Sequence, residues 1–141
     1  AYHTYGGPVI VIDCGTTTTF NVISEKGEFL GGLISFGLKT SADALSGNTA
    51  KLPKIELVSP PSIVCKTTIT NMQSGIINGF RGMVEHIIKK IKEETGYKDA
   101  KVVATGGLSE LIRADGDAID VFDRTLTLRG LNIIYKLNTQ K

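Results

Sequence analysis

The sequence predicts an α/β domain in which helices cover a mixed sheet. β-Branched and aromatic runs open the chain, a long segment of helical periodicity occupies its middle, and strands alternate with helices after it. The 141 residues are enough for one domain with its own hydrophobic core, and the length does not suggest a second domain.

Three strands are expected first. Residues 9–12 form a short β-branched run bounded by turn residues, which is typical of a buried central strand. Residues 16–23 are rich in β-formers, and residues 28–35 contain Gly31 and Gly32, which suggest a bulge or a close backbone approach. Short turns join the three strands, so we expect an antiparallel meander.

A long helix follows an irregular stretch. Between residues 36 and 64 we expect a helix near 41–45 and otherwise a loop with at most one short strand. Residues 69–95 carry apolar side chains at helical spacing, and Thr70 with Gln73 makes a predicted capping box. The apolar residues on this face are Met72, Ile76, Phe80, Met83, Ile87 and Ile91.

Strands and helices alternate after the long helix. We expect a strand at 101–105, a short helix at 108–113, a brief strand at 119–121 and an amphipathic helix at 125–137. A three-stranded antiparallel meander followed by alternating helices and strands is the order of a ribonuclease-H-like lobe.

The composition excludes several classes of function. Hydrophobic residues make up 41% and charged residues 21%, which argues against disorder. The net charge is +2 without a basic block, so we expect no nucleic-acid partner. The sequence has no apolar run of about 18 residues and no charged-then-apolar leader, so we expect no membrane partner. Cys14 and Cys65 lack CxxC spacing, which favours reduced thiols and a cytoplasmic protein.

Polar residues after the first strand form a candidate phosphate site. Asp13 ends a buried strand, where a carboxylate is costly unless it meets a cation or hydrogen-bond donors. Gly15 lets the backbone turn, and the hydroxyls of residues 16–19 can donate to phosphate oxygens. An acidic residue beside phosphate donors needs a neutralising cation, so the pattern favours a combined site. A plain hairpin with a turn-capping Asp also explains these residues.

Two further motifs suit anionic or nucleotide ligands. Gly106 and Gly107 lie between a strand and a helix, where they would let a ring or a phosphate approach the backbone. A left-handed turn that requires glycine explains them as well. Residues 66–68 place a cation and hydroxyls near the start of the long helix, although N-capping by Thr68 or Thr70 has the same signature.

Gly75, Gly79 and Gly82 form a stripe on one face of the long helix. Glycine inside a helix costs about 1 kcal/mol relative to alanine, so three of them suggest a very close neighbour. A neighbouring helix, a second copy of the chain, a ligand or the domain's own sheet would each be such a neighbour. Residues 115–117 are typical of a solvated turn, and His3 and His86 have no partners at metal-ligand spacing.

Taken together, these segments resemble the type III pantothenate kinase family along nearly the whole chain. The motifs that carry the resemblance are residues 7–19, 27–32, 52–53, 66–68, 72–75, 104–108 and 126–131. The family belongs to the actin-like ATPase superfamily, whose members fold as two ribonuclease-H-like lobes around a nucleotide. The resemblance implies ATP-dependent phosphorylation of pantothenate, the first step of coenzyme A biosynthesis, with Mg²⁺ and a monovalent cation such as K⁺ or ammonium.

By this resemblance each candidate residue has an expected role. Asp13 looks like the ligand of the monovalent cation, and Thr16 with Gly15 looks like the contact to the ATP phosphates. The glycines of the 106–107 turn would lie near the adenosine. Thr68 looks like a pantothenate contact that reaches the pocket from across a homodimer interface.

The sequence departs from the family pattern at three positions. Cys14 stands where the family usually has an aromatic residue, and we expect this change to affect packing only. Cys65 and Thr67 stand where it has Gly and Asn, and the change at Thr67 puts pantothenate affinity in question.

The family's first-lobe loop, Asp-x-Gly-Asn-Thr, and its catalytic aspartate have no counterpart in the sequence. Residues 1–5 look like the tail of a helix already under way. We therefore expect residues 1–141 to be a single C-terminal lobe whose N-terminal lobe is absent, and to be inactive alone because no catalytic residue is present. A non-catalytic interaction module derived from this lobe and a related kinase with another substrate are the alternatives.

Overall fold

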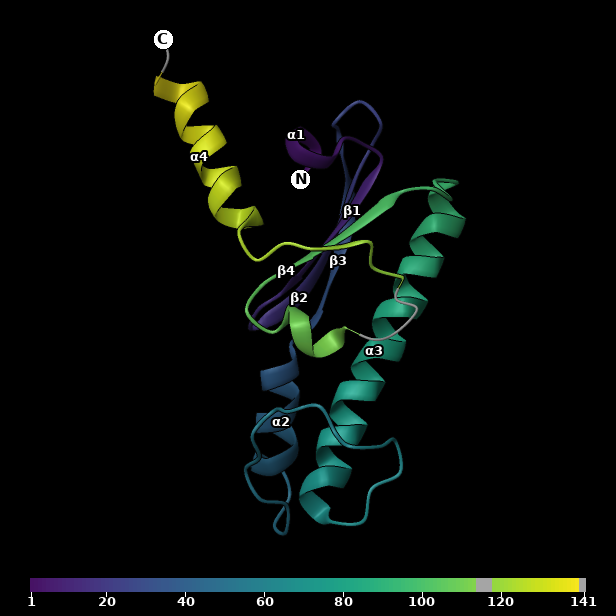
Figure 1. Ribbon diagram of the computed structural model, residues 1–141, viewed down its shortest axis with the longest axis vertical. Helices are drawn as coiled ribbons and strands as arrows, with labels where there is room; N and C mark the ends of the chain where they lie inside the picture. Colours follow the sequence, from purple (N-terminus) through teal and green to yellow (C-terminus); the bar gives the residue numbers. More distant parts are fainter. Residues whose placement is uncertain (114–117, 140–141) are drawn as a thin grey trace.

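The computed structural model describes residues 1–113 and 118–139 and contains a five-stranded mixed sheet with the strand order β3-β2-β1-β4-β5 (Figure 1). The first three strands form an antiparallel meander, and β4 and β5 run parallel to β1. This is the topology of a ribonuclease-H-like lobe, so the predicted fold class is confirmed. The strands are β1 Val9–Cys14, β2 Thr17–Ile23, β3 Phe29–Phe36, β4 Lys101–Thr105 and β5 Val121–Phe122.

Helices surround the sheet unevenly. The long helix α3 packs on one face, α2 lies beside the first half of α3, and α4 extends away from the sheet (Figure 1). The helix expected near 41–45 is longer than predicted, and residues 48–67, all of them described, form a loop without a strand. The helices are α1 Tyr2–Tyr5, α2 Leu38–Gly47, α3 Thr68–Thr95 and α4 Leu126–Thr139, with a 3₁₀ helix η1 at Ser109–Ile112.

The core forms where α3 meets the centre of the sheet. Ile10 and Ile12 of β1 are fully buried because neighbouring strands pair with β1 on both sides and α3 covers this face. A smaller cluster lies on the opposite face, where Val9, Val103 and Leu126 are buried. Burial on both faces fixes β1 and therefore fixes the place where its carboxyl end emerges.

The start of α3 differs from the prediction. Thr67 is the N-cap and makes the capping box with Thr70, rather than Thr70 with Gln73. Gln73 is buried instead, and its amide donates to the Glu56 carbonyl oxygen over 2.8 Å. Gly96 ends the helix in the left-handed conformation, with φ 75°, as its position predicts.

The edge strand β3 shows both features expected of its paired glycines. Its register with β2 shifts between Val22 and Ile23, opposite Gly31, whose φ is 129°. A Cβ atom on Gly32 would lie 2.1 Å from the Phe20 carbonyl oxygen, so the two backbones touch. These glycines therefore serve strand pairing.

Candidate functional site

The turn after β1 carries the first predicted site. Asp13 is the next-to-last residue of β1 and is half-buried, whereas Gly15 and Thr16 are exposed. The Gly15 amide donates to the Thr17 carbonyl oxygen over 3.0 Å, which closes the turn. Thr16, three residues after Asp13, is thus exposed to solvent in this turn.

The turn after β4 lies directly beside Asp13. In the parallel pairing of β1 with β4, Asp13 is opposite Thr105, so the residue after Thr105 reaches the same edge of the sheet. Gly106 has φ +96°, and a Cβ atom there would lie 2.5 Å from the Cys14 carbonyl oxygen and 2.8 Å from Asp13 Oδ1. Gly106 therefore adopts a left-handed conformation and also lies in close contact with the end of β1, and each of these features requires glycine.

The amino end of α2 completes this group, although the local sequence does not predict it. A Cβ atom on Gly37, the N-cap of α2, would lie 2.3 Å from the Thr16 carbonyl oxygen. The Thr40 hydroxyl donates to the same oxygen over 2.8 Å. The positive end of the α2 dipole thus faces the turn, which favours an anion there. The only sequence signal was a glycine between a predicted strand and a predicted helix.

The Asp13 carboxylate lacks a partner within the described part of the chain. Among the described residues no side chain or amide donates a hydrogen bond to it, and no basic side chain pairs with it, although it is half-buried. A carboxylate in this setting is stabilised by a hard cation with oxygen ligands. The described residues hold no cluster of three or more His, Cys, Asp or Glu that could bind a metal ion.

Cys14 points from the same strand end into the core. Burial, with a further contribution from the neighbouring Asp13 charge, raises the pKa of the Cys14 thiol from 9.0 to about 12. The thiol is therefore neutral at physiological pH and has little nucleophilic character.

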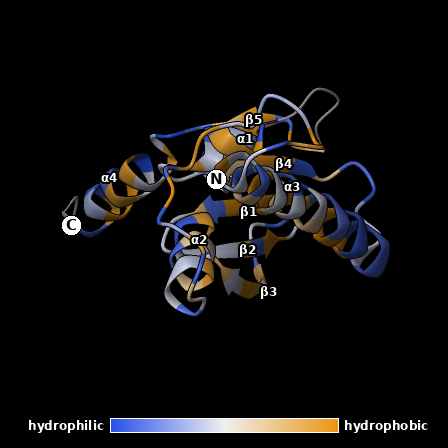
Figure 2. Ribbon diagram, turned by 90° about the horizontal axis from the view of Figure 1, so that it is seen from below, coloured by the Kyte–Doolittle hydropathy of each residue, from blue (hydrophilic) through white to orange (hydrophobic). Residues whose placement is uncertain are grey.

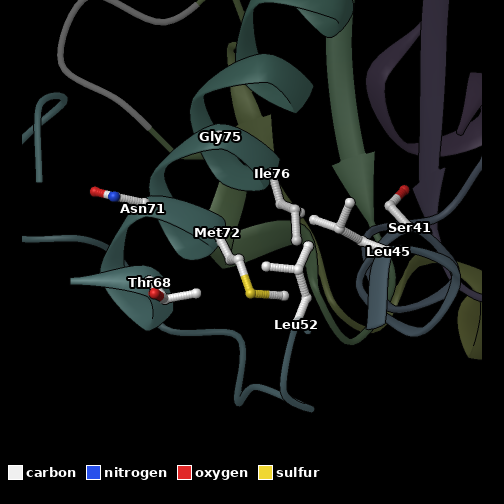
Figure 3. A pocket seen from close by; sticks show the side chains of 8 residues that line it. All are labelled: Ser41, Leu45, Leu52, Thr68, Asn71, Met72, Gly75 and Ile76. Atoms are coloured by element: carbon white, nitrogen blue, oxygen red, sulfur yellow. The ribbon is translucent and has the colours of Figure 1, made fainter. Parts of the chain in front are cut away.

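Thr68 lies in a separate cavity of about 610 Å³ between α2, α3 and the loop at Leu52 (Figure 3). Thr68 is exposed as the first residue of α3, and Met72 projects into the cavity opposite Leu52 (Figure 3). Asp13 and Gly106 do not line this cavity. The lining residues are Ser41, Leu45, Leu52, Thr68, Asn71, Met72, Gly75 and Ile76.

Helix α2 connects the two regions. Its first turn contacts the Thr16 carbonyl oxygen, and Ser41 and Leu45 on the following turns line the Thr68 cavity. The Ser41 hydroxyl donates to the Gly37 carbonyl oxygen over 2.9 Å, which ties the cavity wall to the N-cap. The structure therefore brings Asp13, Thr16 and Gly106 together and places Thr68 at the far side of one short helix.

Comparison with known proteins shows to which family the chain belongs. The family model described as type III pantothenate kinase matches residues 1–90. The chain belongs to the type III pantothenate kinase family. A type III pantothenate kinase from Agathobacter rectalis is 50% identical over all 141 residues, and the chain covers 54% of that relative. The chain thus spans about half the length of the curated kinase it matches.

A solved structure supports the fold independently. The crystal structure of a Campylobacter jejuni protein described as a Baf family transcriptional activator superposes with a TM-score of 0.64 at 22% identity. The match covers 99% of this chain and 62% of the other. At this identity the likeness concerns the fold alone.

The central kinase-family motif at residues 72–75 has a structural explanation. The Gln73 amide donates to the Glu56 carbonyl oxygen, and the Ser74 hydroxyl donates to the Ile63 carbonyl oxygen over 2.6 Å. Both side chains are buried and hold the loop of residues 48–67 against α3. The motif therefore shapes the region of the cavity that Thr68 lines.

The glycine stripe of α3 faces outward. Cβ atoms on Gly75, Gly79 and Gly82 would meet nothing within 4 Å. Tight packing on the domain's own sheet, one of the explanations for these glycines, is therefore not what the structure shows.

The predicted solvated turn at residues 115–117 lies outside the described residues. None of the helices described is long and apolar enough to cross a membrane.

The two glycines of the 106–107 turn should differ sharply in tolerance. Gly106→Ala forces a Cβ atom against the Cys14 backbone and should lower the free energy of unfolding by about 1–3 kcal/mol. Gly107→Ala adds a methyl group in open space and serves as the matched control. Chemical denaturation of both variants checks this, and equal stability would contradict the close approach of the two turns.

The two cysteines should also differ. With its thiol pKa raised, Cys14 should resist a thiol reagent at neutral pH, whereas the partly exposed Cys65 reacts. Below pH 9 the thiol is protonated in both the folded and the unfolded chain, so stability should fall as the pH rises from about 9 toward 12. Counting labelled thiols by mass spectrometry tests this, and rapid labelling of Cys14 in the native chain would refute it. Cys65→Ser is the control.

Proposed function

We propose that this chain is the C-terminal lobe of a kinase that transfers the γ-phosphate of ATP to pantothenate, the first step of coenzyme A biosynthesis in the cytoplasm. The observation that carries the proposal is the Asp13 carboxylate, without a described protein donor, next to the Gly15–Thr16 turn and the amino end of α2. Family membership supplies the reaction class. The coverage of 54% supports the presence of a second lobe in the complete protein.

Under this proposal each residue at the carboxyl ends of β1 and β4, which we call the phosphate end, has its own role. The Thr16 hydroxyl donates to an ATP phosphate oxygen, and Gly15 keeps the turn narrow enough for the nucleotide to approach. Asp13 is the ligand of a monovalent cation, K⁺ or ammonium, which offsets the negative charge that the phosphates and the carboxylate share. Mg²⁺ enters with ATP. Gly106 and Gly107 lie near the adenosine, where the space beside Gly107 is open and Gly106 packs against the Cys14 backbone.

The Thr68 cavity is the proposed pantothenate region. It combines apolar walls with the polar side chains of Ser41, Thr68 and Asn71, which suits a small acid that carries hydroxyl and amide groups. In a homodimer Thr68 would contact pantothenate across the interface. The outward glycine stripe of α3 supports this, because helices approach closely only where side chains are small.

Phosphoryl transfer depends on positioning and on charge neutralisation from both walls of a cleft. The described residues of this chain form one wall, and the base that receives the proton of the attacking hydroxyl belongs to the preceding lobe. The 141-residue chain alone is therefore inactive.

The outward glycine stripe also favours a second function, a non-catalytic module that binds a partner through α3. The encoding gene distinguishes the two: a preceding lobe that contains Asp-x-Gly-Asn-Thr supports the kinase, and its absence supports the module.

The isolated chain and the complete protein should differ in activity. With ATP, Mg²⁺, K⁺ and pantothenate, the complete protein should form phosphopantothenate and the 141-residue chain should not, because one wall of the cleft is missing. A coupled ADP-release assay measures both. Turnover by the isolated chain would place the base inside residues 1–141 and overturn the assignment. An inactive complete protein would overturn the kinase itself.

Thr68→Ala in the complete protein should affect the use of pantothenate and leave the use of ATP unchanged. Loss of a hydroxyl that contacts pantothenate should raise the KM for pantothenate by about tenfold, equivalent to about 1.4 kcal/mol, and leave the KM for ATP unchanged. Thr49→Ala is the matched control, because the Thr49 hydroxyl bonds only its local helix carbonyl. Equal changes in both KM values would argue against a role for Thr68 in substrate binding.

A further inference from the structure

Arg81 lies near the middle of α3 and is half-buried, although arginine side chains are mostly exposed. Hydrophilic residues such as Arg81 are interspersed with hydrophobic ones along this helix (Figure 2). The Nη2 atom of Arg81 donates to the Leu111 carbonyl oxygen over 3.1 Å and to the Arg113 carbonyl oxygen over 2.7 Å. Within the described ranges, none of the ion pairs joins Arg81 to a carboxylate. The guanidinium group therefore binds the backbone at the end of η1.

The helix η1 needs such a contact. It is a single 3₁₀ turn of four residues, and a helix this short is not stable by itself. The last carbonyl groups of any helix have no partner inside it. Helix α3 contacts η1, the short green helix beside it in Figure 1, and Arg81 supplies the missing donors across this contact.

The neighbouring turn of α3 orients the guanidinium group. Its Nη1 atom donates to Asn78 Oδ1 over 3.5 Å, and the Asn78 amide donates to the Ser74 carbonyl oxygen and hydroxyl over 3.1 and 3.0 Å. The Nε atom of Arg81 is buried without a hydrogen-bond partner among the described residues. A buried donor without an acceptor costs free energy, so the bonds of Nη1 and Nη2 outweigh this cost and fix the side chain.

The other end of η1 holds the 106–107 turn. Ser109, the first residue of η1, is fully buried. Its hydroxyl donates to the Gly106 carbonyl oxygen over 2.8 Å, and its amide donates to the same oxygen over 3.3 Å. Gly106 in turn lies in close contact with the end of β1. A continuous series of contacts therefore joins Arg81 to the phosphate end.

We propose that Arg81 is a positioning residue for the nucleotide, which holds the end of η1 and thereby fixes the 106–107 turn beside the adenosine of ATP. This inference rests on the proposed function, which assigns that turn to the adenosine. Arg81 does not line the Thr68 cavity. Its effect should therefore concern ATP and not pantothenate.

Nucleotide binding and turnover of the complete protein test this role. Arg81→Gln should raise the KM for ATP, and the Kd for ADP in titration calorimetry, by about tenfold, and should leave the KM for pantothenate unchanged. Arg81→Lys keeps the charge, but its ammonium group ends one bond short of the Nη2 position, so both values should still rise by about threefold or more. Lys89→Gln removes an exposed positive charge from α3, and this matched control should change none of the three values.

Three results would overturn the positioning role. They are a lower melting temperature of Arg81→Gln with unchanged nucleotide values, equal increases in both KM values, and an Arg81→Lys variant that matches wild type. The first would show a purely structural role, and the last would show simple attraction of the phosphates by a positive charge. If Arg81→Gln does not fold, Arg81→Lys decides the question by the same criteria.

Failure of this inference differs from failure of the proposed function. A complete protein that phosphorylates pantothenate with a KM for ATP independent of Arg81 overturns the positioning role alone. A complete protein that binds ADP more weakly after Arg81→Gln, but does not phosphorylate pantothenate, supports the positioning role and overturns the proposed function. A complete protein that neither binds ADP nor turns over overturns both.

Discussion

The parallel pairing of β1 with β4 is the constraint on which the candidate site depends. It places Asp13 opposite Thr105, and the backbone that follows each strand then meets at one edge of the sheet. Because Gly106 comes so close to the Cys14 carbonyl oxygen and to Asp13 Oδ1, no other residue type fits there without moving the carboxylate. A half-buried carboxylate without a described protein donor results, and a cation beside phosphate oxygens is the ligand chemistry that such a group favours.

Helix α2 links this edge to the cavity at Thr68. Gly37 and Thr40 hold the amino end of α2 against the Thr16 turn, while Leu45 lines the cavity. The same helix therefore contacts both the Thr16 turn and the cavity. Within one chain, the spacing between the Thr16 turn and the Thr68 cavity is therefore set by a single element of ten residues.

Much of the fold could be predicted from the sequence, because local patterns determine it. The β-branched run that becomes β1 and the apolar periodicity of α3 each specify one element. The predicted position of the capping box was wrong by about one helical turn. The threonine-rich start of α3 offers several possible N-caps, and Thr67 is the one whose backbone is extended, as an N-cap requires.

The candidate site could be predicted only in part. Asp13, Gly15 and Thr16 are adjacent in sequence, so their motif is visible there. The contacts of Gly37 and Thr40 with that motif arise from the packing of α2 and leave no local pattern. Amphipathic spacing likewise predicted α4 and did not indicate that most of its apolar surface would remain exposed.

The central claim is that Asp13 binds a monovalent cation that supports phosphoryl transfer. It is tested most directly by the turnover of the complete protein at increasing KCl and constant ionic strength. Wild type and Asp43→Asn, which alters an exposed carboxylate on α2, should both be activated by K⁺. Asp13→Asn should show no K⁺ activation and should turn over about tenfold more slowly or worse, equivalent to about 1.4 kcal/mol. A K⁺ dependence of Asp13→Asn parallel to that of wild type would contradict the account.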